Sequence, residues 1–577
     1  MTVKTDLTTY THCLRICIVP GHFEDERIRN VLDFCLKYGF KNVMLFINAE
    51  EYNVGHMTIE EAKPWVATIR KAKKIFNDAG ISVSLNPWIM IGHLDRGRTL
   101  KPGQDFVTME DMEGTSLHMV ACMLDENWKR YYLEFAEYLI RETEPDTYWI
   151  EDDFRLHNHG ELVFGGCFCE HHMREYNRRL GTNLSREEFV RRVFRKGKAT
   201  PERKVWLDTS REVMRGLAEE VGKRIASLGL GTKVALMSSK PESHCMEARD
   251  WRGVLEGFAQ GGTLINRIHL PCYGEMTGKR YIYGFNAISM FVRALSPAET
   301  VIYPELENAY FNTYSKDSRF LQFQVEASMP LLASGMTYDI FDFVGNGAVE
   351  ALGYGPVLAE LTPELQAVMD QKIPFSGARG IAVPVSERAC YSIEIGEGGW
   401  QDLYNKEGYF AAFLSAHGIN FRYAKDPVPA GEAVGLCASN LSYFSDEELE
   451  KLFREHFVFL EGGAVLGLAE RGLGRLIGAK SAERIPADTN VQSYEEAAPD
   501  LIVEGIRGCR ATAQIPAGDY VRVAYEEEVH AYTRLFDCRQ RYVGPGIAGG
   551  KNFTVFPFVV GSDILPEQFH ELRRQAV

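Results

Sequence analysis

The chain has 577 residues, 45% hydrophobic and 25% charged, the composition of a soluble globular protein of roughly two to four domains. Its net charge of −15, with no basic run to offset it, argues against a nucleic-acid partner or an anionic membrane surface. No stretch reaches the apolar length of a membrane span, and residues 1–6 lack the basic and apolar segments of a signal peptide. Twelve scattered cysteines then indicate mostly free thiols in a reducing cytoplasm.

Apolar strand-like runs alternate with helical patterns over the first 375 residues. Continuous apolar runs are typical of parallel strands that are buried on both faces. Eight such runs, separated by helices and without long antiparallel hairpins, predict a (β/α)8 TIM barrel over residues 1–375. The predicted strands are Leu14–Val19, Asn42–Asn48, Ile81–Trp88, Thr147–Ile150, Lys233–Ser239, Leu264–Pro271, Thr300–Asn308 and Met336–Asp342.

A second pattern of strands and helices begins near Ser376. Ile381–Val385 and Ala433–Cys437 read as strands, and a serine-capped helix is expected from Ser445 to Glu455. Gly462–Leu468 is expected to complete a β-α-β-like module. Residues 501–523 and 532–560 are strand-rich, so we expect an α/β module with a strand-rich tail over residues 376–577.

Three adjacent carboxylates, Glu151, Asp152 and Asp153, directly follow the apolar residues of the fourth predicted strand. A β/α barrel builds its active site at the C-terminal ends of its strands. Adjacent acids repel one another, so the run favours a functional site over an ordinary helix N-cap or a surface charge cluster. More polar residues follow at once: Arg155, His157 and His159.

A second acidic pair, Glu305 and Glu307, ends the seventh predicted strand. Residues two apart on an extended strand face the same way. Strands four and seven lie opposite each other in an eight-stranded barrel, so acids at their C-terminal ends could approach across its open end. Two carboxylates about 5–5.5 Å apart would be the nucleophile and the acid/base of a retaining glycosidase. The alternative is a pair of structural acids bonded to loop amides or arginines.

Other predicted strand ends carry residues suited to a sugar. Aromatic rings stack on the apolar faces of pyranoses, while polar side chains bind the hydroxyls. Each residue alone is more often a core or loop residue than a ligand contact, so only their coincidence at several strand ends indicates a site. The candidate substrate-binding residues are Trp88, His93, Arg155, His157, His159, Tyr273, Glu307, Asn308 and Asp339.

With these motifs, the barrel resembles the clan A glycoside hydrolases, in particular the family 42 β-galactosidases. In that family the acid/base glutamate closes strand four in an Asp-Asn-Glu run after a tryptophan, and the nucleophile ends strand seven. Here Trp149 precedes the run Glu151–Asp153, and Glu305 ends strand seven. The passage from Arg319 to Gly335 resembles the family's helix-Gly-strand passage into strand eight. Two later segments resemble its flavodoxin-like trimerisation domain: Ser445–Leu449 and Leu460–Leu466.

The resemblance implies a cytoplasmic retaining glycoside hydrolase that acts on a small oligosaccharide or glycoside. Glu305 would be the nucleophile and Asp153 the acid/base, with Glu151 or Asp152 as the fallback. Asp153 stands where the family has a glutamate, and it is shorter by one methylene. The flavodoxin-like module implies a homo-oligomer, dimer or trimer. The reaction itself requires no cofactor.

Cys167, Cys169 and either His171 or His172 form a separate cluster in the sequence. Thiolates and imidazoles are zinc ligands, and a closed structural site needs four. Related barrels carry a Cys-x-Cys-x-x-Cys cluster near this position, and here His172 stands at the third cysteine. One hypothesis is a structural zinc with a fourth ligand from elsewhere, such as Cys122. The other is two buried thiols beside a helix N-terminus.

Three other functions stay open from the sequence. An inverting or transglycosylating enzyme could use the same barrel, and inverting enzymes need carboxylates about 6.5–9.5 Å apart. A metal-dependent hydrolase or isomerase would bind a divalent ion through Glu151, Asp153, His157 and His159. A sugar-binding protein without catalysis would bind glycosides without turnover.

Overall fold

The chain forms two compact units. The computed structural model describes residues 2–157, 159–163, 165–271, 273–275, 280–308, 311–489, 492–514, 518–561 and 570–577. The first unit comprises residues 1–195, 199–277 and 296–375, and the second 196–198, 278–295 and 376–577. The long C-terminal segment of the second unit thus begins at Ser376. Two short segments, 196–198 and 278–295, interrupt the first unit in the sequence but belong to the second, so a single boundary does not describe the division.

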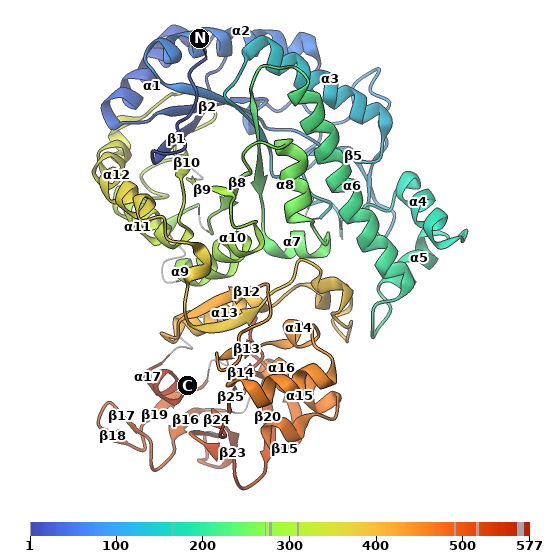
Figure 1. Ribbon diagram of the computed structural model, residues 1–577, viewed down its shortest axis with the longest axis vertical. Coiled ribbons are helices and arrows are strands. Elements are labelled where there is room, and N and C mark those ends of the chain that lie inside the picture. Colours follow the sequence, from blue (N-terminus) through green and yellow to red (C-terminus); the bar gives the residue numbers. More distant parts are fainter. Residues whose placement is uncertain are drawn as a thin grey trace. The chain divides into compact units, whose positions relative to one another are not determined.

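The first unit is a closed barrel of eight parallel strands, as predicted (Figure 1). Its order around the ring is β1-β10-β9-β8-β7-β6-β3-β2. Each barrel strand is therefore hydrogen-bonded to the barrel strands that precede and follow it along the chain. The last barrel strand, β10, pairs with the first, β1, and this closes the barrel. The strands are β1 (Thr11–Ile16), β2 (Asn42–Ile47), β3 (Ser82–Pro87), β6 (Thr147–Ile150), β7 (Lys233–Ser238), β8 (Ile265–His269), β9 (Val301–Glu307) and β10 (Gly335–Asp339).

The first strand lies three residues earlier than predicted, at Thr11–Ile16 rather than Leu14–Val19. All six of its residues are buried, so an apolar run alone does not mark where the strand starts. Its register is set by pairing, with Thr11 opposite Gly335 on β10 and Cys13 opposite Asn42 on β2.

The barrel interior has an apolar layer, and a charged layer follows it toward the C-terminal ends of the strands. Cys13, Trp149, Ile265 and Tyr303 belong to one buried cluster inside the ring. Alternate residues of a strand face the same side, so the next inward position lies two residues further toward the C-terminal end. Those next positions are occupied by Arg15, Glu151, Arg267 and Glu305.

Helices follow most barrel strands and begin at defined caps. Thr58 and Glu61 form a reciprocal capping box on α2, and Asp125 caps α3. Thr200 caps α6, whose first residue is Pro201. The barrel helices are α1 (Glu24–Tyr38), α2 (Ile59–Asp78), α3 (Glu126–Thr143), α6 (Pro201–Ala226), α8 (Trp251–Ala259), α11 (Ser318–Ala327) and α12 (Tyr354–Asp370).

The loops after the third, fourth and fifth barrel strands carry additional elements. These loops leave the C-terminal ends of the strands, where a barrel builds its site. The added elements are β4 (Thr108–Glu110), β5 (Ser116–Ala121), α4 (Glu170–Leu180), α5 (Arg186–Val193) and α7 (Pro241–Met246).

The main sheet of the second unit has the order β12-β11-β13-β14-β25-β24-β21. Its first five strands are parallel, and their order is that of flavodoxin-like folds. The strands are β11 (Ile381–Pro384), β12 (Phe421–Ala424), β13 (Val434–Leu436), β14 (Val458–Glu461), β21 (His530–Ala531), β24 (Ala548–Gly549) and β25 (Phe553–Phe556). The helices along these strands are α13 (Glu407–Ala416), α14 (Ala438–Leu441), α15 (Asp446–Glu455) and α16 (Gly462–Glu470).

The expectation for Gly462–Leu468 as the closing strand of the β-α-β module is wrong, because these residues lie in α16. The strand is the preceding segment, β14. The helix begins where it does because the Glu461 carboxylate accepts the backbone N–H groups of Gly463 and Ala464. Gly462 is required there because a Cβ would meet the backbone of Phe558.

The rest of the second unit is rich in short strands, as predicted. Helical residues 280–295, between two barrel strands in the sequence, include α9 (Arg280–Gly284), a π-helix (Phe285–Met290) and α10 (Phe291–Leu295). The C-terminal helix α17 (Glu571–Ala576) is tied to the sheet by an ion pair between Arg573 and Glu495. The strands are β15 (Ala479–Ile485), β16 (Tyr494–Ala497), β17 (Ile502–Val503), β18 (Ile506–Arg507), β19 (Arg510–Thr512), β20 (Tyr520–Tyr525), β22 (Thr533–Phe536) and β23 (Tyr542–Pro545).

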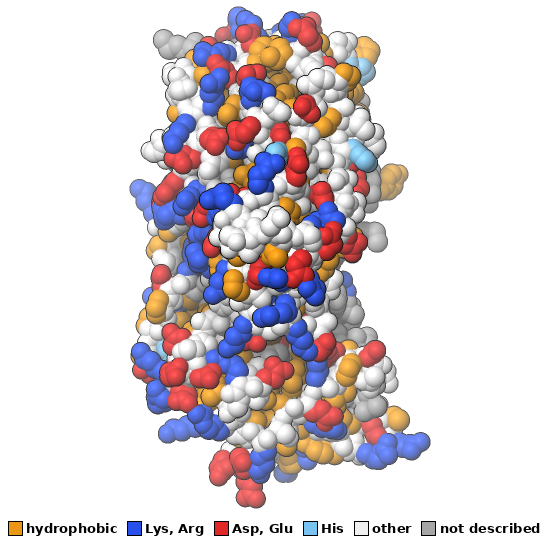
Figure 2. All heavy atoms as spheres, turned by 90° about the vertical axis from the view of Figure 1, so that its right-hand side faces the viewer, with side chains coloured by type: hydrophobic (Ala, Val, Ile, Leu, Met, Phe, Trp, Pro, Cys, Tyr) orange, Lys and Arg blue, Asp and Glu red, His pale blue; other side chains and the backbone are white. Residues whose placement is uncertain are grey.

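The surface carries mixed charge. Acidic and basic side chains are interspersed over the face shown in Figure 2, and lysines and arginines do not gather into one continuous patch there. Among the described residues, every helix is too short or too polar to cross a bilayer.

Two glycines of α6 offer a matched test of the barrel's outer layer. A Cβ on Gly222 would clash with the backbone oxygens of Gly257 and Phe258 on α8, whereas a Cβ on Gly216 would meet nothing. We expect Gly222→Ala to lower the free energy of unfolding by about 1–3 kcal/mol. Gly216→Ala should raise it by up to about 1 kcal/mol through helix propensity. Urea unfolding followed by circular dichroism measures both, and equal effects would contradict this packing.

Candidate active site

Glu305 lies at the end of β9, buried inside the barrel. Its carboxylate is bonded to Arg15, to Arg267 Nη1 at 2.7 Å, and to His269 Nδ1 at 3.3 Å. Burial opposes ionisation, but the two guanidinium groups outweigh it and lower the pKa of Glu305 to about 2. Glu305 is therefore an anion over the ordinary pH range.

Glu151 faces the same arginines from the end of β6. Arg267 Nη2 lies 3.1 Å from Glu151 Oε1, and Arg15 Nη2 lies 3.8 Å from Glu151 Oε2. Asn86 on β3 donates a hydrogen bond of 2.7 Å to the same Oε2. Glu151 is thus held inside the ring by donors from three strands.

Glu307 and Asp339 are opposed on neighbouring strands β9 and β10. Asp339 is buried, and its nearest cation is Arg15 at 3.4 Å. Burial, with the negative charge of Glu305, raises the pKa of both carboxyl groups well above the usual range. Both groups therefore favour the protonated form, in contrast to Glu305.

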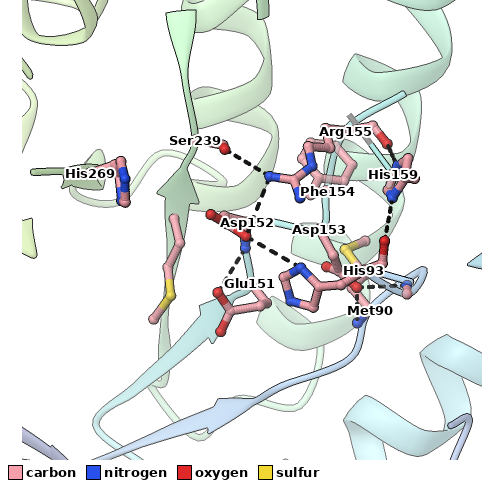
Figure 3. A network of polar contacts seen from close by, with 12 residues as sticks. Met90, His93, Glu151, Asp152, Asp153, Phe154, Arg155, His159, Ser239 and His269 are labelled. Atoms are coloured by element: carbon pink, nitrogen blue, oxygen red, sulfur yellow. Dashed lines mark hydrogen bonds and ion pairs between the residues drawn. The ribbon is translucent and has the colours of Figure 1, made fainter. Parts of the chain in front are cut away.

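Asp152 is the member of the acidic run that remains partly exposed, with 19% of its side chain accessible. It points toward His93 Nδ1 at 3.6 Å and Arg155 Nη1 at 3.7 Å (Figure 3). Arg267 Nη1 lies 3.9 Å from its carboxylate. Burial opposes its ionisation, but Arg155, Arg267 and His93 outweigh it and hold the pKa of Asp152 below its usual range.

Arg267 limits the separation of Asp152 and Glu305. Its Nη1 atom lies 2.7 Å from Glu305 Oε2 and 3.9 Å from Asp152 Oδ2. These two oxygens can therefore be at most about 6.6 Å apart, the sum of those distances. Carboxylates from barrel strands four and seven thus meet above the barrel, as the sequence predicts.

Asp153 is not brought to this group. It is fully buried, and its Oδ2 accepts the backbone N–H groups of Met90 at 2.8 Å and Gly92 at 2.7 Å (Figure 3). Burial raises its pKa to about 6. Its charge adds to the effect of burial in raising the pKa of Tyr132 and Tyr148, so it lies on the helix-facing side of β6. Its geometry is that of a loop anchor.

The two histidines of the acidic loop are buried within the protein. His159 contacts the backbone oxygens of His93 at 3.0 Å and Arg155 at 2.9 Å (Figure 3). Burial lowers the pKa of His157, and burial with the Arg155 charge lowers that of His159 to about 4. Both are therefore neutral residues that shape the loop rather than cations facing a ligand.

A buried ion pair on the loop after β7 supports the acidic loop. Arg249 is bonded to Glu247 at 3.0 Å and donates to the Phe154 carbonyl, while the Leu156 N–H donates to Glu247 at 3.1 Å. Ser239, at the end of β7, accepts a hydrogen bond of 2.7 Å from Arg155 (Figure 3). The direction of Arg155 and the path of residues 154–156 are thus set by a neighbouring loop.

A cavity of ≈ 300 Å³ lies next to the residues that contact Asp152. Two of its lining residues, His93 and Arg155, are also the neighbours of Asp152. Trp88 forms an aromatic wall, with its ring 5.8 Å from Phe46 and 5.6 Å from Phe343. The size is at the lower end for small-molecule pockets, about 300–1,000 Å³. Its lining is Glu50, Asn53, Trp88, His93, Leu94, Arg96, Arg155 and Gly160.

Two further predicted residues, Tyr273 and Asn308, lie near the acids of β9 and β10. Tyr273, 40% exposed, packs edge-on against His269 at 5.5 Å. Its hydroxyl is close enough to Glu307, Glu305 and Asp152 for their charges to reinforce burial in raising its pKa. Asn308 is buried, and its N–H donates to the Asp339 carbonyl at 2.9 Å.

Arg15 and Arg267 were missed by sequence reasoning, although they contact more of the predicted acids than any other described residue. A signal was available, because each interrupts an apolar barrel strand at an inward position, in Leu14-Arg15-Ile16 and Asn266-Arg267-Ile268. A charged residue inside a two-sided strand needs a partner, and the predicted acids supply it.

Cys167, Cys169 and His172 lie together with Cys122, the fourth ligand suggested from the sequence. All four are buried, and their ligand atoms lie within 4.8 Å of one another. Cys169 Sγ is 3.4 Å from Cys122 Sγ, and His172 Nδ1 is 3.2 Å from Cys122 Sγ. Sulfur ligands on a tetrahedral zinc lie about 3.8 Å apart, so the donor set fits that ion in kind, number and spacing.

The residues of the metal-dependent alternative do not converge in the same way. Among the described residues, the second group with metal-ligand spacing is His93, Glu151 and Asp152, without Asp153, His157 or His159. Its carboxylates already face Arg155, Arg267 and Asn86, which leaves a divalent cation beside guanidinium groups.

No protein-family model and no curated protein matches the sequence. Solved structures share its fold. The α-L-fucosidase isoenzyme 2 from Paenibacillus thiaminolyticus has a TM-score of 0.58 and 12% identity, over 97% of this chain and 82% of that chain. The β-galactosidase from Rahnella sp. R3 has a TM-score of 0.60 and 12% identity, over 100% and 89%. Gan42B, a GH42 β-galactosidase, has a TM-score of 0.57 and 9% identity, over 98% and 87%.

These similarities confirm the resemblance in fold to clan A glycoside hydrolases that the sequence suggests. They cover both units, the barrel and the flavodoxin-like sheet, since nearly the whole chain aligns. At such low identity, the likeness establishes architecture, and function must be argued from the site.

Proposed function

We propose that the protein is a retaining glycoside hydrolase in which Glu305 is the nucleophile and Asp152 the acid/base. The observation that carries this proposal is the upper limit of about 6.6 Å between their carboxylate oxygens. Retaining enzymes separate the pair by about 5–5.5 Å, and inverting enzymes by about 6.5–9.5 Å to leave room for a water. The retaining range lies within this limit.

The reaction has two displacements. The Glu305 carboxylate attacks the anomeric carbon, and the bond to the leaving oxygen breaks as Asp152 gives that oxygen its proton. Asp152, now ionised, then removes a proton from a water whose oxygen attacks the same carbon and releases Glu305. Glu305 suits its part because two arginines keep it ionised.

Asp152 replaces Asp153 in the acid/base role. The sequence offers it as an alternative for that role. It is partly exposed next to His93, whereas the Asp153 carboxylate accepts two backbone N–H groups. Its cationic neighbours favour the ionised form, so the proton needed for a poor leaving group is present mainly at acidic pH.

The cavity beside Asp152 supports a small sugar as the substrate. Trp88 offers an aromatic face for a pyranose ring, and His93 and Arg155 offer polar groups for its hydroxyls. The solved structures of similar fold include a fucosidase and β-galactosidases, which favours a short glycoside or oligosaccharide as the substrate class.

We also propose that Cys122, Cys167, Cys169 and His172 hold a structural zinc ion. The set has four protein ligands, which is the composition of closed structural sites rather than catalytic ones. Bound there, zinc would tie the end of β5 to the start of α4. Both segments belong to loops that surround the acidic run.

The cysteines and the flavodoxin-like sheet bear on where the protein is located and how it assembles. Nine of the described cysteines are buried, and those described are not joined in disulfides, which supports a reducing cytoplasm. The flavodoxin-like sheet supports a homo-oligomer, dimer or trimer, by its resemblance to a trimerisation domain.

Replacing the nucleophile tests the reaction. Glu305→Gln keeps the shape of the side chain and a hydrogen-bond acceptor for the arginines. We expect it to lower kcat/KM by at least about 10⁴-fold on any nitrophenyl glycoside that the wild type hydrolyses. Far-UV circular dichroism should be unchanged. Glu142→Gln, an exposed residue that pairs with Arg70, is the matched control and should retain activity. Turnover by Glu305→Gln near the wild-type rate would reject the proposed function.

Leaving-group dependence tests Asp152. For Asp152→Ala we expect hydrolysis of a methyl glycoside to fall by about 10²–10⁴-fold, because an alkoxide needs a proton. Formation of the glycosyl-enzyme from the matching dinitrophenyl glycoside should change little, because that leaving group departs without one. In the wild type, activity on the methyl glycoside should decline as pH rises through the lowered pKa of Asp152. Equal losses on both substrates would rule out this role.

Metal analysis tests the zinc site. The protein purified without chelator should contain about one zinc per chain by mass spectrometry. Cys169→Ser should lose the metal and lower Tm by roughly 5 °C or more. Cys35→Ser, which alters another buried thiol, should keep the zinc content of the wild type. Protein from zinc-supplemented cells that contains no zinc would exclude the site.

A further inference from the structure

We propose that Arg267 is a positioning residue whose guanidinium group contacts both the nucleophile and the acid/base, so that one side chain sets both edges of the pH range for catalysis. This inference rests on the proposed function. It adds a residue that the comparisons do not point to and that the two displacements do not themselves require.

Arg267 is the middle residue of β8 and points into the barrel. It is 2% exposed, and its nearest contacts are carboxylates on both sides. Nη1 lies between Glu305 at 2.7 Å and Asp152 at 3.9 Å, while Nη2 lies 3.1 Å from Glu151. A guanidinium group presents its donors in a rigid plane, so these contacts fix the positions of the acids relative to one another.

The other two arginines of the site each contact one member of the catalytic pair. Arg15 is bonded to Glu305, with Asp339 and Glu151 as its other acidic neighbours. Arg155 contacts Asp152 and Ser239. Within the described residues, Arg267 is thus the guanidinium group with ion pairs to both Glu305 and Asp152. This difference makes Arg15 and Arg155 natural controls.

Glu305 and Asp152 are surrounded by charged and titratable groups from several strands and loops. Removing Arg267 takes away a cation that favours the ionised form of both carboxylates, so their pKa values should both rise. The groups facing Glu305 are Arg15, Arg267, His269, Tyr273, Glu307, Asp339 and Glu151. The groups facing Asp152 are Arg155, Arg267, His93, His269, Tyr273 and Arg249.

Two substrates give separate readouts of the two acids. Formation of the glycosyl-enzyme from a dinitrophenyl glycoside, measured as kcat/KM, needs ionised Glu305 but no proton, so the acidic edge of its pH profile reports Glu305. The ratio of kcat/KM for the methyl glycoside to kcat/KM for the dinitrophenyl glycoside reports the protonated fraction of Asp152. A higher pKa of Glu305 moves the acidic edge of the dinitrophenyl profile to higher pH. A higher pKa of Asp152 moves to higher pH the point at which the methyl-to-dinitrophenyl ratio falls.

We expect Arg267→Gln to move both readouts to higher pH, each by about 1 unit or more. Arg155→Gln should move only the ratio, and Arg15→Gln only the acidic edge. If Arg267→Gln moves one readout or neither, the inference is overturned. The proposed function would still stand, provided that Glu305→Gln is inactive; an active Glu305→Gln would instead remove the basis of both.

A charge-preserving variant covers the case in which Arg267→Gln does not fold. Arg267→Lys keeps the cation but lacks the planar group in which Nη1 faces Glu305 and Asp152 while Nη2 bonds Glu151, so it does not hold the three acids in the same geometry. We expect kcat to fall by about 10-fold or more with KM within about 3-fold, because the pair is misaligned rather than the sugar lost. Arg203→Lys, at another buried arginine bonded to backbone oxygens, is the control for loss of a guanidinium group as such. Wild-type kcat in Arg267→Lys would overturn the inference.

Discussion

The site depends on buried ion pairs between two inward arginines and the acids at the ends of the barrel strands. A buried charge costs several kcal/mol unless it is paired, so Arg15 and Arg267 are tolerated only because Glu151 and Glu305 face them. The reverse also holds, since burial alone would neutralise Glu305. The acids outnumber the cations, and the excess is accommodated by the raised pKa values of Glu307 and Asp339.

The loops around this layer determine which acid of the run stays partly exposed. Asp153 is turned away from the barrel axis by the amides of Met90 and Gly92, and Glu151 is turned inward by arginines. Asp152, between them, is left partly exposed. Arg249 and Glu247 hold the chain beyond the run, and the cysteine cluster joins its far end to β5. Three neighbouring carboxylates thereby acquire three different environments, which is how one sequence motif supplies both structure and chemistry.

Much of this protein was predictable because the signals were local. Eight apolar runs with intervening helices indicated the barrel, and acids at the ends of strands four and seven indicated where a site would lie. The Cys–His cluster was also visible in the sequence. The Gly462 helix was mistaken for a strand because a short apolar run has no decisive period, and its start is set by a cap on Glu461. The roles of Arg15 and Arg267 could not be derived without knowing which strands adjoin.

By itself, the sequence determined the alternation of strands and helices and the positions of the acids along it, since both follow from residue type and spacing. Only the tertiary structure decided that Asp152 rather than Asp153 shares a guanidinium group with Glu305, and that residues 278–295 join the second unit. The physical reason is that side-chain direction at a strand end and the pairing of buried charges depend on neighbours distant in the chain. Barrel closure brings those neighbours within a few ångströms.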